Sequence, residues 1–215
     1  MINPDNRLFC RLDGLTVAAR EQQRTAVMRE LGLLEPESVP VFEEATQIAA
    51  HFLSIPICIL SVMESDRQRF KSAIGLSRLG LMNQLATSRQ FSRAEAFCTH
   101  VVDSQQVLMI PDTLAHPAFA GSLLASQFGI RAYVGVPLIT SSSCCIGALA
   151  IMDLVPRGFT DREIQFLELT ARWAMSEFER RHVTSAPAAP VESHSKLETD
   201  NQAIATQLKI ELLSQ

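Results

Sequence analysis

Five cysteines carry the most reactive side chains of this chain, and their spacing limits the chemistry they can do. They stand at Cys10, Cys58, Cys98, Cys144 and Cys145. An odd number at irregular spacing argues against a disulfide framework and is typical of reduced thiols in a cytosol. Cys58 and Cys145 lie in apolar runs, where free cysteine packs as a small hydrophobe. We therefore expect these two to be core residues, and Cys98 is the candidate for a thiol that faces a pocket.

Cys98 and His100, in the segment FCTH, have the residue types of a metal site. On a helix, side chains two residues apart point about 200° away from each other, so these two cannot bind one ion. We interpret His100 as a hydrogen-bonded histidine on a partly buried helix, with a ligand role as the alternative. No lysine or arginine stands next to Cys98 in the sequence, so no neighbouring positive charge is expected to lower the pKa of its thiol. We expect no metal here.

Cys144 and Cys145 are neighbours in an apolar strand, so their side chains should face opposite sides of a sheet. Neither chelation nor an unstrained disulfide between them is expected. Ordinary packing is the favoured interpretation, and oxidant sensing by the vicinal thiols is the alternative.

The sequence contains none of the common catalytic motifs. It has no Gly-rich phosphate loop, no G-x-S-x-G, no H-E-x-x-H and no paired-cysteine zinc motif, so no catalytic residue is assigned. The formal charge of −4, without a block of Lys and Arg, argues against nucleic acid. No apolar run approaches the roughly 18 to 20 residues that cross a bilayer, and we expect a cytoplasmic protein. Its partners should be proteins or small molecules.

A predicted hairpin lies at the centre of the chain. The segments 131–139 and 144–153 are rich in β-branched and small apolar residues, and the polar segment 140–143 between them has the composition of a tight turn. Both strands are apolar almost throughout, which predicts burial on both faces. Gly135 and Gly147 inside them predict close approach of the backbone.

The remaining elements should surround this hairpin. We expect strands over 57–63, 67–75 and 106–110; the second should be half-exposed near an edge, because Arg67, Arg69 and Lys71 alternate with Gln68, Phe70 and Ser72. Apolar residues at helical spacing predict a helix over 40–53 that packs on the sheet. The sequences S-x-x-E at 92–95 and T-x-x-E at 160–163 predict capping boxes that start two more helices.

FCTH at 97–100, the dipeptide Pro111-Asp112 and the hairpin together resemble a GAF domain. The matching segments run in the family's order from about Phe42 to Phe178. The resemblance implies an α+β fold, with a central antiparallel sheet of five or six strands flanked by helices on both faces. It also implies a ligand pocket that the connection 112–128 helps to enclose. The cofactor-binding residues that we expect are Cys98, Asp112, Phe119, Tyr133 and His100.

Three positions of this connection limit the ligand. Ala118 and His116 stand where an arginine and an acidic residue are frequent in the family, and the missing arginine argues against an anionic ligand. Phytochrome-type members attach a bilin through a cysteine in this connection. Ser122 stands at that position, so covalent bilin attachment is not expected, and the cofactor is unknown.

The segment 77–90 is an insertion relative to the GAF pattern. Together with the preceding residue, the segment carries five large apolar side chains, and these are Leu76, Leu79, Leu81, Met82 and Leu85. The segment is either a lid over one end of the sheet or an apolar loop that docks a partner or gates a ligand.

We expect four parts: an N-terminal segment and helix over 1–36, the GAF domain over 37–182, a linker over 183–194 and an amphipathic helix over 195–215. The first helix, 15–34, looks too polar for a core and is a candidate dimer element. The last has an apolar seam at Leu197, Ile204, Leu208 and Leu212.

The ending KIELLSQ is similar to the segment before the phosphoacceptor helix of sensor histidine kinases. We therefore expect a sensory module of a bacterial, cyanobacterial-like two-component kinase. It would form a homodimer and bind a small ligand or redox cofactor. The alternatives are a stand-alone adaptor that dimerises and binds a protein, and a thiol-dependent reductase.

Overall fold

The computed structural model describes residues 15–35, 37–80 and 83–185. The chain divides into two compact units, Met1–Arg181 and His182–Gln215, and the description below concerns the first. Cys10, residues 186–194 of the expected linker and the C-terminal seam lie outside the described residues, so those expectations stay predictions; residues 183–185 continue the last described helix. None of the described helices is long and apolar enough to span a membrane.

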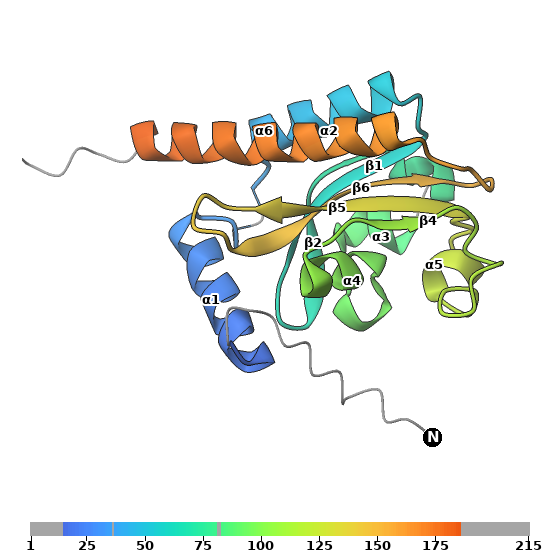
Figure 1. Cartoon of the computed structure of the whole chain (residues 1–215), viewed down its shortest axis with the longest axis horizontal. Helices are drawn as coiled ribbons and strands as arrows, with labels where there is room; N and C mark the ends of the chain where they lie inside the picture. Colours follow the sequence, from blue (N-terminus) through green and yellow to red (C-terminus); the bar gives the residue numbers. More distant parts are fainter. Residues whose placement is uncertain (1–14, 36, 81–82, 186–215) are drawn as a thin grey trace, which may run out of the picture. The chain divides into compact units, whose positions relative to one another are not determined.

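A six-stranded sheet forms the middle layer, and every neighbouring pair of its strands is antiparallel (Figure 1). The strand order is β3-β2-β1-β6-β5-β4. The strands are β1 Ile57–Met63, β2 Arg67–Ile74, β3 Gln90–Ser92, β4 Leu108–Ile110, β5 Ala132–Ile139 and β6 Cys145–Asp153. The predicted hairpin, β5 and β6, lies inside the sheet, which confirms the expected α+β fold.

Helices cover both faces of the sheet (Figure 1). The described helices are α1 Val17–Glu30, α2 Pro40–Phe52, α3 Gln84–Ser88, α4 Phe97–Ser104, α5 Leu123–Ser126 and α6 Asp161–Ser185, with 3-10 turns η1 Leu76–Leu79 and η2 Arg93–Glu95. The helices α2 and α6 pack on one face, while α4 and α5 lie on the other. Helices on both faces are what the resemblance implies.

Each face of the sheet has its own apolar core. Phe42 of α2 and Leu167 of α6 belong to the first core, and Phe97 of α4 belongs to the second. Cys144 packs in the first and Cys145 in the second, which confirms that the vicinal thiols face opposite sides. The expected burial of Cys58, Val134 and Ala148 is also confirmed.

The two glycines of the hairpin are needed for different reasons. A Cβ at Gly147 would lie 1.9 Å from the carbonyl oxygen of Ser61 in β1, so the predicted close approach of the backbone is confirmed. A Cβ at Gly135 would lie 2.2 Å from the hydroxyl of Tyr133. At Gly135 the missing side chain therefore makes room for the tyrosine side chain.

A β-bulge at Lys71 overturns the alternation expected for β2. Leu60 pairs with Ser72 while Ser61 pairs with Phe70, so Lys71 is the extra residue. Beyond it the faces exchange: Phe70 lies in the second core, while the Ser72 hydroxyl is 2.6 Å from that of Thr46 in α2. The ammonium of Lys71 is buried and donates to the carbonyls of Glu35 and Glu37.

The helix α1 is part of the domain, and the expectation that it is too polar to be buried was wrong. Met28 and the following Leu33 are fully buried in the first core. Arg24 is also buried, and its Nε donates to the carbonyl of Cys145 at 3.0 Å. Leu15 and Val17 at the other end of the helix are exposed.

Only one of the two predicted capping boxes forms. At the start of α6, the amide of Glu163 donates to the Thr160 hydroxyl at 3.3 Å, and the amide of Thr160 donates to the Glu163 carboxylate at 2.8 Å. Ser92 instead ends β3 and makes no side-chain cap, and the turn η2 separates it from α4. The prediction of a second box was wrong because the chain is still in the sheet at Ser92.

Candidate functional site

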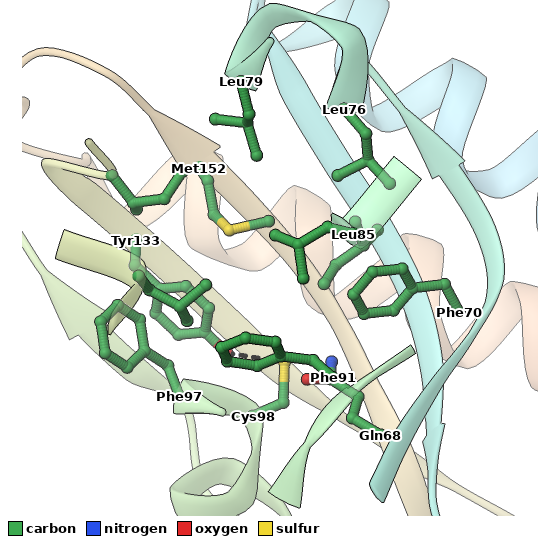
Figure 2. Close-up of a pocket in the computed structure, with 13 residues that line it drawn as sticks. Gln68, Phe70, Leu76, Leu79, Leu85, Phe91, Phe97, Cys98, Tyr133 and Met152 are labelled. Carbon is green, nitrogen blue, oxygen red and sulfur yellow. Dashed lines mark hydrogen bonds between the residues drawn. The ribbon is translucent and has the colours of Figure 1, made fainter. Parts of the chain in front are cut away.

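A small cavity lies inside the second core, between the sheet, α4 and the inserted segment (Figure 2). Its volume is about 20 Å³, which is room for about one water molecule. Three apolar walls enclose it. Aromatic side chains form one of them, and these are Phe70, Phe91, Phe97 and Tyr133. Ile59 and Met152 of the sheet form the second, and the inserted segment supplies the third.

The insertion covers the cavity, as the lid alternative predicts. Leu76, Leu79 and Leu85 all line it (Figure 2). Asn83 holds the two arms of the lid together, because its amide donates to the carbonyls of Leu76 at 2.7 Å and Gly80 at 2.6 Å. Leu81 and Met82 lie outside the described residues. We use the name lid for the described parts, 76–80 and 83–88.

Glycine fixes the first end of the lid. Gly75 has φ of 78°, and a Cβ there would lie 1.8 Å from the carbonyl oxygen of Pro56. Both the left-handed conformation and the close approach therefore require glycine. At the other end Arg89 has φ of 51° and ends α3. Two positions with left-handed backbone thus bound the lid.

Polar side chains form the floor of the cavity, in an otherwise apolar core. The hydroxyl of Tyr133 donates to Sγ of Cys98 at 3.2 Å (Figure 2). The amide of Gln68 donates to the hydroxyl of Ser61 at 2.6 Å. All four side chains are buried, so their hydrogen bonds offset a desolvation cost that an apolar floor would avoid.

The thiol and the phenol of the floor are neutral. Burial raises the pKa of Cys98, and hydrogen bonds from Tyr133, Gln68 and Ser61 offset part of that rise. Burial also raises the pKa of Tyr133 well above its ordinary value. Neither group therefore carries charge near neutral pH.

The other described cysteines are equally poor nucleophiles. Burial raises the pKa of Cys58 and of Cys144, and Cys145 is buried as well. A thiol with a raised pKa holds little thiolate, which is the reactive form. Among the described residues, no group of three His, Cys, Asp or Glu side chains could hold a metal ion.

The structure brings together two of the five residues that the sequence singles out. Cys98 and Tyr133 line the cavity. Phe119 is buried behind it, with its ring centre 5.0 Å from that of Phe97. His100 is exposed on α4 and contacts Phe119. Asp112 lies outside the lining and forms a bidentate ion pair with Arg131, at 3.0 and 2.9 Å.

Sequence reasoning missed Gln68 as a site residue. It was assigned only to the alternating pattern of β2, whose charged neighbours Arg67 and Arg69 are half-buried. An amide between two charged residues in a strand does not indicate burial, because an exposed strand has the same pattern of residues. The partner that explains its burial, Ser61, lies in another strand and is visible only in the folded chain.

An ionic chain links the elements around the cavity to α1. Arg93, in the turn η2 between the lid and α4, lies 2.6 Å from Glu21 of α1 and 2.9 Å from Asp103 of α4. Glu21 also pairs with Arg24 at 2.7 Å. Burial raises the pKa of Glu21, but the ion pair with Arg93 and the charge of Arg24 outweigh it, so the pKa is lowered.

Comparison with known proteins agrees with this architecture. The family model described as "GAF domain" matches residues 39–178, which is most of the chain. The chain belongs to the GAF domain family. As a GAF domain it has a sensory or regulatory role.

A curated relative, a cyclic di-GMP phosphodiesterase of Pseudomonas aeruginosa, is 30% identical over 179 residues. The alignment covers 82% of this GAF chain and 29% of the relative, so the chain spans less than a third of that protein.

Two solved structures show the same fold at low sequence identity. The GAF domain of a phosphoenolpyruvate-protein phosphotransferase from Coxiella burnetii is 16% identical, with a TM-score of 0.54. The match covers 78% of this chain and 99% of the Coxiella chain. The free methionine-R-sulfoxide reductase of Neisseria meningitidis is also 16% identical, with a TM-score of 0.52. The match covers 75% of this chain and 87% of the reductase chain.

Proposed function

We propose that this GAF domain senses a small molecule that binds in the cavity between Tyr133, Cys98 and the lid. The observation that carries the proposal is the buried polar floor beneath a separate lid. A core built only for stability would be better filled by apolar side chains, because each buried polar group must offset its own desolvation. An apolar pocket with a few convergent polar groups is the usual form of a ligand site.

The ionic chain provides a route from the cavity to α1. A ligand larger than the cavity must displace the lid, and the lid continues through β3 into the turn that holds Arg93. Arg93 contacts both Glu21 and Asp103. Binding would therefore act on the attachment of α1 as well as on α4.

Two outputs are candidates for the protein to which this domain belongs. The C-terminal resemblance favours a two-component histidine kinase. The curated relative favours control of cyclic di-GMP, because that relative is named as a cyclic di-GMP phosphodiesterase and its similarity covers most of this chain. In either case the domain itself supplies regulation and the output supplies catalysis.

Self-association is a further part of the proposal. The helices α2 and α6 expose apolar side chains, and these are Ile48, Phe52, Leu169 and Trp173. Phe52 stacks on Phe166, with 4.1 Å between ring centres, which joins the two helices into one surface. A second copy of the chain would remove this surface from water.

The test uses the full-length protein that the native host produces. We would measure autophosphorylation with ATP and hydrolysis of cyclic di-GMP in the wild type and in Leu79→Glu. Leu79 is half-buried in the lid, so the variant should fold while its carboxylate disturbs the cavity. The control is Leu114→Glu, an exposed position outside the cavity lining.

We expect one of the two activities to be present and to change in Leu79→Glu but not in the control. An output with equal activity in all three proteins would overturn the sensory role of the cavity. Circular dichroism of each variant shows whether the domain is folded, so that a loss of structure is not taken for a loss of signalling.

A further inference from the structure

The side chains that line the cavity carry no charge. Gln68 is an amide, and the thiol of Cys98 and the phenol of Tyr133 are neutral at physiological pH. All other lining residues are apolar. An anion moved into such surroundings loses its hydration without gaining a counter-charge, which is costly.

Three cations near this end of the domain are already engaged elsewhere. Arg131 forms its bidentate pair with Asp112, and Arg93 is shared by Glu21 and Asp103. The ammonium of Lys71 donates to two backbone carbonyls that precede α2. A phosphate that used one of these three cations would have to break that cation's present interaction.

The aromatic side chains that line the cavity favour a ligand with an aromatic ring. The Phe97 and Tyr133 ring centres are 5.3 Å apart, with an angle of 82° between the planes, so an edge and a face are both presented. Phe91 and Phe70 also line the cavity (Figure 2). The volume of about 20 Å³ is too small for any ring, so a ring binds only when the leucines of the lid move outward.

The hydroxyl of Tyr133 in the floor can make one more hydrogen bond. A phenolic hydroxyl donates one proton and also accepts. Tyr133 gives its proton to Cys98, and its oxygen can accept an N–H or O–H from a ligand. A ligand with an N–H or O–H donor would satisfy this oxygen.

We infer that the cavity binds an uncharged aromatic molecule with an N–H or O–H donor, and that it excludes nucleotides. This inference rests on the proposed function, because it names the chemical class of the molecule that the domain would sense.

The test uses Tyr133 as a spectroscopic label, since it is the only tyrosine of the chain. Protein of the full 215 residues that contains 3-fluorotyrosine gives one ¹⁹F resonance from the cavity floor. We would titrate it with indole, with indole-3-acetate as the matched charged probe, and with cyclic GMP. Indole should shift the resonance saturably, and the two anions should bind weaker by about tenfold or more.

A variant places the binding event in the cavity. Leu79→Trp adds an indole ring at the lid and should weaken binding of free indole by about tenfold, whereas Leu169→Trp on the exposed face of α6 should leave it unchanged. Equal weakening in both variants, or none in either, would overturn the assignment of the site.

The remaining outcomes separate the ligand class from the sensory role. If indole-3-acetate or cyclic GMP binds as tightly as indole, the inference that the ligand is uncharged is overturned. The proposed sensing of a small molecule is not. A resonance that none of the three probes moves would also overturn the class. The proposed function itself is then decided by the output assays of Leu79→Glu, which require no added ligand.

Discussion

Breaking the ion pair between Arg93 and Glu21 should destabilise the domain measurably. The side chains are 14% and 22% exposed, so the pair lies between a surface pair, worth about 0 to 1 kcal/mol, and a buried one, where loss of one partner costs about 3 to 5 kcal/mol. Arg24 still neutralises Glu21 in Arg93→Met, which reduces the cost. We expect Arg93→Met to lower the free energy of unfolding by about 2 kcal/mol.

A double-mutant cycle isolates the pair from the other contacts of Arg93. Arg93→Met, Glu21→Gln and the double variant would be unfolded in urea and followed by far-UV circular dichroism. We expect a coupling energy of about 1 to 2 kcal/mol. The control pair is Arg180 and Glu177, 2.8 Å apart on the exposed face of α6, for which about 0.5 kcal/mol or less is expected.

Acid should abolish the coupling between Arg93 and Glu21. The pKa of Glu21 is lowered in the folded protein, so its stabilisation is fully present above the ordinary carboxyl value of 4.5 and is lost as the pH falls through the lower folded value. A coupling energy at pH 7 no larger than that of the control pair would refute the ionic link. So would a coupling energy that persists unchanged at a pH low enough to protonate Glu21.

Three further results are expected. Gly147→Ala should cost about 3 kcal/mol or more in urea unfolding, because its Cβ has no space beside Ser61, and a cost below about 1 kcal/mol would contradict this close approach. Cys98 should resist alkylation by iodoacetamide at pH 8, because burial and a raised pKa both suppress the thiolate; labelling as fast as that of the unfolded protein would contradict this. In sedimentation, Trp173→Glu should weaken self-association, and a dimer indifferent to this change would exclude the α2 and α6 surface.

The sheet and its covering helices could be predicted because their residues follow simple patterns. The hairpin 132–153 is apolar almost throughout, and Phe42 and Ala45 recur at helical spacing in α2. Such regular runs of apolar residues indicate both the element and its burial. The resemblance to a family then supplied the antiparallel sheet with helices on both faces, which periodicity alone does not determine.

The bulge at Lys71 and the polar floor could not be predicted, for a physical reason. The bulge at Lys71 reverses the faces of β2, and it exists only because β1 pairs on both sides of that residue. Gln68 is polar in the sequence and buried in the fold, because Ser61 satisfies its amide from another strand. Long-range partners decide both features, and short-range patterns do not contain them.

The tethers of α1 give this helix the mechanics of a lever. Near its C-terminal end, Leu33 is buried and Lys71 holds the carbonyls of Glu35 and Glu37, so this end is a fixed pivot. Farther along, Glu21 rests on Arg93. A helix of 14 residues is about 21 Å long, so a tilt of about 10° about the pivot moves its free end by about 4 Å. A small displacement of Glu21 by Arg93 would thus be larger at Val17, where the helix begins.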